Sequence, residues 1–239
     1  MKSTNENLNL WDHLTELATE LADLAKPRQY FSHFFGALAA VLLANLWLSG
    51  SATAHVSASH VNGFWAGVAH PIGGLDHILA MVAVGLWAAQ LGKKALWAVP
   101  LSFVAVMTGG AWLGTMQLNL PFVEQGILAS DFILGLVILC AVRLPLMVSA
   151  SLVGILAVFH GYAHGAEMPA TASGLAYGAG FLVSTVALHL SGLVVGLGLK
   201  AMTVKLSAKV QDWALRCGGV AILGGASWQL YTTMTQVSP

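Results

Sequence analysis

Residues 70–87 of this chain read HPIGGLDHILAMVAVGLW, an apolar run that opens with two histidines and one aspartate. The apolar character extends from residue 64 to residue 91, which is longer than the about 20 residues that a helix needs to cross a bilayer. An ionisable side chain at membrane depth is costly, so it is a candidate for function. This stretch therefore predicts a membrane-spanning helix that carries chemistry.

The composition extends this prediction to the whole chain. Hydrophobic residues fill 57% of the 239 positions, charged residues fill only 8%, and the mean hydropathy is +0.76. A soluble domain carries about 25% charged residues, so we predict an all-α, polytopic bundle of membrane helices. The formal net charge is zero and gives no reason to expect a nucleic-acid partner. The apolar stretches predict six transmembrane helices, near residues 64–91, 95–116, 125–142, 144–163, 172–199 and 217–234.

The chain before residue 55 divides into two parts. Residues 1–28 form a polar N-terminal extension, and residues 29–54 form an apolar run that we interpret as a signal peptide or an anchor helix. Ala52 and Ala54 are spaced as in a secretory cleavage site, and cleavage there would make His55 the new N-terminus. Residues 55–239 then form the six-helix transport domain.

The basic residues predict how the helices are oriented. When residues 1–28 are placed in the cytoplasm, all ten Lys and Arg residues fall on that side, as the positive-inside rule requires. The mature N-terminus and the C-terminus then lie outside the inner (plasma) membrane. Glu124 and Glu167 fall on the outer surface, where they would attract cations. Cys140 and Cys217 lie in no C-x-x-C motif, and we expect them to be reduced packing residues.

The first candidate motif contains His70, Asp76 and His77. Pro71 removes a backbone donor between the two histidines, and two glycines permit non-helical angles there. Transporters build ion sites at such helix breaks, because the freed carbonyls can also coordinate. The alternative is a structural His–Asp pair that bridges helices. We favour an ion site because three costly groups coincide at one break.

The second motif reads FHGYAHGAE over residues 159–167. His160 and His164 lie one helical turn apart, so their rings can share a metal, and Glu167 follows one turn later. The alternative is an aromatic-rich helix end at the membrane interface. Imidazole with carboxylate suits nickel, cobalt, zinc or copper(II), and the lack of a nearby thiolate argues against copper(I).

Four further residues are candidates by position. Asp131 and His189 lie within predicted spans, where we expect each to line the pore or to support a metal ligand. His55 and His60 precede the first mature span, and they could catch a metal at the entrance or be plain exposed histidines.

Both motifs resemble those of the HupE/UreJ family, accessory membrane proteins of nickel enzymes such as hydrogenase and urease. The likeness rests on residues 70–87 and 159–167 and covers the chain from residue 55 to its end. It implies a nickel permease with a cleavable leader and hydrogenase or urease maturation proteins as partners. It also implies that six side chains handle the ion: His70, Asp76, His77, His160, His164 and Glu167.

The sequence therefore predicts a permease that imports Ni²⁺, or Co²⁺, into the cytoplasm. The ion is the transported substrate, so we expect no prosthetic group and no enzymatic activity. One alternative is an intramembrane zinc-dependent hydrolase, in which His160 and His164, with His77 or His189 and Asp76, hold zinc and an activated water. Another is a non-transporting accessory protein that hands metal to a maturation complex. The sequence leaves open whether the chain forms a homo-oligomer.

Overall fold

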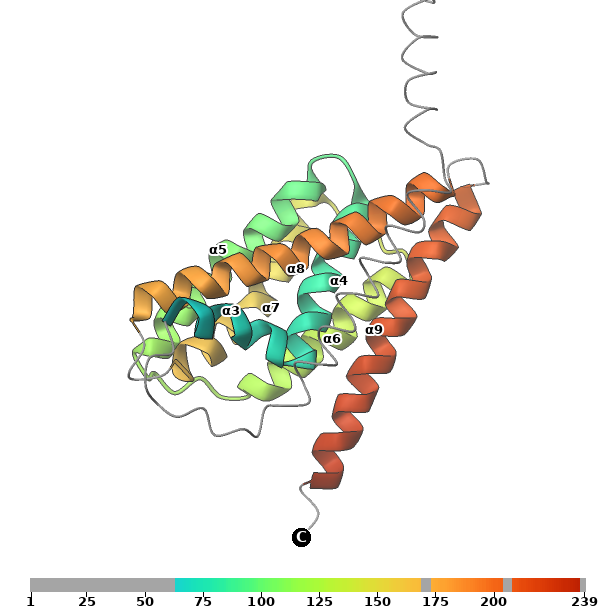
Figure 1. The fold of residues 1–239 in the computed structure, drawn as a ribbon. Coiled ribbons are helices and arrows are strands. Elements are labelled where there is room, and N and C mark those ends of the chain that lie inside the picture. The colour runs from blue at the N-terminus through green and yellow to red at the C-terminus, as the bar shows by residue number, and fades with distance from the viewer. Residues whose placement is uncertain (1–62, 169–172, 204–207, 237–239) are drawn as a thin grey trace, which may run out of the picture. The chain divides into compact units, whose positions relative to one another are not determined.

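The structure is a computed structural model that describes residues 63–168, 173–203 and 208–236. The predicted N-terminal extension, the leader over residues 29–54, and His55 and His60 lie outside the described residues. The described ranges contain seven helices and no strand, which confirms the all-α prediction (Figure 1). The helices are α3 Gly63–Gly73, α4 Leu75–Leu91, α5 Ala95–Thr115, α6 Val123–Leu139, α7 Leu146–Ala166, α8 Gly174–Met202 and α9 Ala208–Gln236.

The break predicted in the first motif is present at the junction of α3 and α4. Gly74 has extended backbone angles, with φ −104° and ψ 124°, and the two helices meet at 81°. Pro71 lies in the last turn of α3. Because the chain turns here, His70 and His77 belong to two helices with different axes.

Length and apolar character identify the helices that could cross a bilayer. Among the described residues, α5, α7 and α8 qualify, and the bent pair of α3 and α4 adds a fourth if it counts as one span. Helix α6 has only 17 residues, and α9 is 29 residues long but less apolar than the others. The count of six spans therefore stays a prediction, although a helix is present in each of the six predicted places.

Helices α5 and α7 form the most extensive helix pair, and glycines let their backbones touch. A Cβ added to Gly161 or Gly165 would lie 2.0 Å from a carbonyl oxygen of α5, and one added to Gly110 or Gly114 would lie 2.6 or 2.3 Å from one of α7. These four glycines thus form a seam that no larger residue fits. By contrast, nothing lies within 4 Å of a Cβ added to Gly178.

Contacts at other glycines show whether the remaining helix pairs are parallel or antiparallel. Helices α4 and α8 run the same way, because Gly85 lies against the backbone of His189, and Ala89 lies against Gly196 further along. The α5–α7 seam is also parallel. Helices α6 and α9 are antiparallel, because Gly135 lies against Leu223 while Gly219 lies against Leu139. A chain that reverses direction at every connection produces these three relations.

The outer faces of the helices are as apolar as the core. Trp87, Phe103 and Met107 are fully buried, whereas Trp112 and Ile155 are 62% and 63% exposed. Large apolar side chains on the outside of a helix bundle are costly in water but not in lipid. This distribution, with the helix lengths, supports a multi-pass membrane protein.

Basic side chains gather at the end of α4 that lies away from the helix break. Lys93, Lys94 and Arg143 line a groove of about 470 Å³ there. The ammonium of Lys200 donates to the carbonyl oxygens of Ala89 and Gln90, at 2.6 and 3.3 Å. Basic residues from two connections and from the last turn of α8 therefore share one end of the bundle, as the charge pattern predicted.

Candidate metal site

The rings of four histidines from three helices come together; they are called the histidine cluster below. His164 of α7 lies between the other motif's two histidines, with ring centroids 4.7 Å from His70 and 4.2 Å from His77. His160 lies 5.3 Å from His77, and His70 lies 6.4 Å from His77. The two sequence motifs, far apart in the chain, therefore meet in space.

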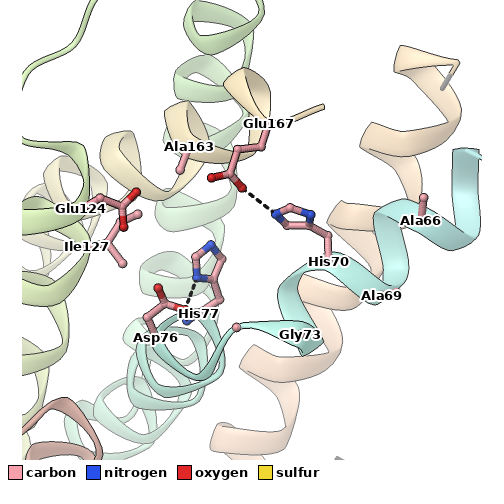
Figure 2. Close-up of a pocket in the computed structure, with 11 residues that line it drawn as sticks. Ala66, Ala69, His70, Gly73, Asp76, His77, Glu124, Ile127, Ala163 and Glu167 are labelled. Atoms are coloured by element: carbon pink, nitrogen blue, oxygen red, sulfur yellow. Dashed lines mark hydrogen bonds and ion pairs between the residues drawn. The ribbon is translucent and has the colours of Figure 1, made fainter. Parts of the chain in front are cut away.

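Two local features produce this meeting. The turn at Gly74 redirects the chain between α3 and α4, so that both motif histidines face α7 (Figure 2). The glycine seam holds α7 against α5, and this seam includes Gly161 and Gly165, which directly follow the two histidines of α7. The candidate ligands His160 and His164 therefore alternate along α7 with the glycines that set its packing.

Three carboxylates surround the cluster in one cavity of about 500 Å³. Asp76, Glu124 and Glu167 all line it, together with His70 and His77 (Figure 2). Glu167 Oε2 lies 3.3 Å from His70 Nε2, and Asp76 Oδ1 lies 2.6 Å from His77 Nδ1. The predicted outer carboxylates thus lie at the same cavity as the first motif.

Hydrogen bonds define which ring nitrogens are available to a metal. The Ser130 hydroxyl lies 2.6 Å from the carbonyl oxygen of Ile127 and 2.7 Å from His160 Nε2; when it donates to the carbonyl, it accepts from His160 Nε2. The lone pair of His160 is then on Nδ1, which is buried and has no partner. In the same way, donation from His77 Nδ1 to Asp76 leaves the lone pair of His77 on Nε2.

His164 is the most available ligand of the cluster. Its side chain is 1% exposed, and neither ring nitrogen has a hydrogen-bond partner. Its ring packs 4.1 Å from the ring of Phe181 on α8. A buried imidazole without a partner is unfavourable, and a bound metal ion would satisfy it.

Gln229 of α9 links Asp131 to the first motif. With its amide oriented to suit its neighbours, the nitrogen donates to Asp131 Oδ2 at 3.2 Å and the oxygen accepts from the backbone N–H of Asp76 at 2.7 Å. Asp131 is fully buried. Asp131 is thus linked through Gln229 to the backbone of the first motif.

Two supporting residues were missed by the sequence analysis. Ser130 is one of many serines in apolar helices, and Gln229 lies near the end of the last helix without any motif around it. Only the structure shows that Ser130 contacts His160 and that Gln229 contacts Asp131 and the backbone of Asp76. A polar residue within an apolar stretch was the one available signal.

His189 lies beyond the histidine cluster. The ring of Phe103 packs 5.0 Å from His189 and 5.7 Å from His160.

Cys140 and Cys217 are free, as predicted, but both are exposed, so they are not core packing residues. Within the described ranges, no three His, Cys, Asp or Glu side chains are arranged as a ready-made metal cage.

Comparison with known proteins gives two matches. The family model described as HupE / UreJ protein matches residues 40–226. Protein HupE of Rhizobium leguminosarum bv. viciae is 46% identical over 187 residues, which are 77% of this chain and 95% of that protein. No solved structure is similar. The matched family range contains both histidine motifs and ends before Gln229.

Proposed function

This chain belongs to the HupE/UreJ family, and from that premise we propose that it is a membrane permease for a divalent transition metal. The substrate is Ni²⁺, with Co²⁺ as the nearest competitor, and the destination is the cytoplasm. There the metal serves hydrogenase or urease maturation. The mature N-terminus and the C-terminus lie on the outer side of the membrane in this proposal.

The convergence of the histidine cluster beside three carboxylates carries the proposal. Four ring-to-ring contacts, with centroids 4.2 to 6.4 Å apart, join the four imidazoles of α3, α4 and α7. Imidazole with carboxylate is a ligand set for nickel and cobalt, whereas calcium and magnesium prefer oxygen ligands alone. Such a set in a bundle with lipid-type outer faces supports a membrane protein that handles a transition metal.

The geometry supports a stepwise path. The cavity carboxylates Glu124 and Glu167 attract a hydrated cation, and His70 beside Glu167 offers the first imidazole. His164 lies next to both His70 and His77, so the ion can exchange one ring for the next without leaving the cluster. Ligand exchange between neighbouring weak sites permits flux, because a closed cage would trap the ion.

The membrane potential gives this path its direction. Moving one positive charge inward is favourable by about 2.3 kcal/mol for each 100 mV, and a divalent ion gains twice as much. The gathering of basic residues at the far end of α4 supports placing that end in the cytoplasm. The carboxylate-lined cavity then opens outward.

Uptake of labelled nickel by cells tests the proposal. His77→Ala and His164→Ala should each lower the initial rate by about 10-fold or more at equal protein level, since metal sites lose about that much when a supporting group is removed. Thr108→Ala is the matched control, because this exposed threonine on α5 bonds only to the Val104 carbonyl of its own helix. Equal uptake by all variants would reject the permease.

The two alternatives predict different measurements. The family is one of transport and accessory proteins, which speaks against the zinc hydrolase. A hydrolase would purify with one tightly bound zinc and show no metal flux. An accessory protein would bind nickel through His77 and His164 but give wild-type cells no more uptake than cells without the protein.

A further inference from the structure

Three neighbouring polar side chains of α8 are buried without hydrogen-bond partners. Ser184, Thr185 and His189 are 3%, 0% and 2% exposed. Neither hydroxyl oxygen and neither nitrogen of the His189 ring has a partner. Four unsatisfied polar atoms within two helical turns are unusual, because buried polar groups are nearly always paired.

Other hydroxyls in the bundle are satisfied in the ordinary way. On the same helix, Ser191 donates to the carbonyl of Leu188 and Thr203 donates to that of Leu199, both at 2.7 Å. A hydroxyl in an apolar helix commonly takes this local bond to the preceding turn. Thr185 and Ser184 do not, so they remain free to bind something else.

These groups continue the path that begins at the histidine cluster. Along α8, Tyr177 lies beside His70, with ring centroids 6.0 Å apart, and Phe181 lies beside His164. Thr185 is one turn further and His189 one turn beyond that, on the same face of the helix. The line runs from the cavity towards the end of α8 where the basic residues gather.

We propose that His189 and Thr185 form a second station that binds the transported divalent metal ion on the inner side of the histidine cluster. This inference rests on the proposed function, because it adds a step to the same path. One imidazole with one hydroxyl oxygen is a weaker ligand set than four imidazoles. A weaker inner station suits release, since an ion must leave the last site readily.

Uptake kinetics test the station. His189→Leu should lower the maximal rate of nickel uptake about 10-fold while the apparent KM changes less than about 3-fold, because the outer cluster still captures the ion. Thr185→Val removes the hydroxyl at constant shape and should lower the maximal rate several-fold. Ser191→Ala is the control on the same helix, because that hydroxyl already bonds to Leu188. A maximal rate in His189→Leu equal to that of the wild type overturns the station.

A rescue experiment separates metal binding from packing. His189→Cys restores a metal ligand, and a thiolate favours soft ions. We expect this variant to recover transport and to shift its preference from Ni²⁺ towards Cd²⁺. A His189→Cys protein as inactive as His189→Leu would show that the histidine only fills space, and it would overturn the station.

A binding measurement keeps this test separate from the permease proposal. Purified protein titrated with Co²⁺ should show a visible absorption contribution that His189→Leu removes and Ser191→Ala retains. If wild-type cells take up no nickel, the permease proposal fails, and this spectrum still decides whether the station exists. An identical Co²⁺ spectrum in wild type and His189→Leu overturns the station.

Discussion

Replacing Gly161 by alanine should disable the protein without touching any proposed ligand. The new Cβ would lie 2.0 Å from the carbonyl oxygen of Met107 and 2.9 Å from the nitrogen of Ala111. Both are backbone atoms, so the rotation of a side chain cannot relieve the clash. Ordinary contact begins at 3.4 Å, so the two helices must part by the difference, 1.4 Å.

The separation should affect stability and function to different degrees. Overpacking of this kind costs about 1–3 kcal/mol of folding free energy. His160 and His164 flank the substituted position and would move with α7 relative to α4. Metal–ligand distances tolerate only about 0.2 Å, and a displacement near 1 Å can reduce activity about 100-fold. The rate of nickel uptake should therefore fall about 100-fold, whereas the folding free energy should fall by only about 1–3 kcal/mol.

Gly109→Ala is the matched control for this change. Gly109 lies on α5 beside the same seam, but nothing lies within 4 Å of its added Cβ. Alanine is favoured over glycine in a helix by about 1 kcal/mol, so this variant should be at least as stable as the wild type. Thermal unfolding in detergent and labelled nickel uptake at equal protein level would be measured for both variants. Wild-type uptake by Gly161→Ala would refute the seam as the element that positions the cluster.

Three further predictions concern supporting residues and the cavity entrance. Ser130→Ala should raise the KM for nickel about 10-fold, because His160 loses the acceptor that keeps its lone pair on Nδ1; initial uptake rates over a nickel series measure this. Gln229→Leu should lower stability by about 1–3 kcal/mol, because Asp131 then lacks its buried partner; thermal unfolding measures the loss. Glu167→Gln should raise the KM more at low salt than at high salt, because it removes a carboxylate at the cavity; uptake at two ionic strengths shows the difference.

Ser227→Ala provides the control for the first two changes. This exposed serine lies on α9 and donates only to the carbonyl of Leu223 in its own helix, at 2.7 Å. It should keep wild-type stability and uptake. Ser130→Ala with an unchanged KM would mean that the serine does not orient the ring. For Glu167→Gln, a KM ratio that is the same at both ionic strengths would contradict the electrostatic role.

Much of the candidate site could be predicted from the sequence, because the free-energy cost of an ionisable side chain in an apolar stretch arises at that residue itself. A histidine or aspartate in an apolar stretch is conspicuous wherever the helix packs, and five of the six motif residues are of this kind, whereas Glu167 was named because it follows His164 by one turn. The helix break followed from Pro71 and its neighbouring glycines, whose backbone preferences act at their own positions. The signal for Ser130 and Gln229 was too weak to single them out, because small or neutral polar residues are common in membrane helices.

Sequence alone determined where the helices lie, where the first of them breaks and which side chains are candidates for binding a metal, because hydropathy and backbone preference are properties of short segments. Tertiary structure decided which of those side chains meet, which ring nitrogens stay free and which hydroxyls of α8 lack partners. The physical reason is the membrane environment. Helices in lipid are apolar on every face, so their sequences contain little of the amphipathic pattern that would reveal which face turns inward.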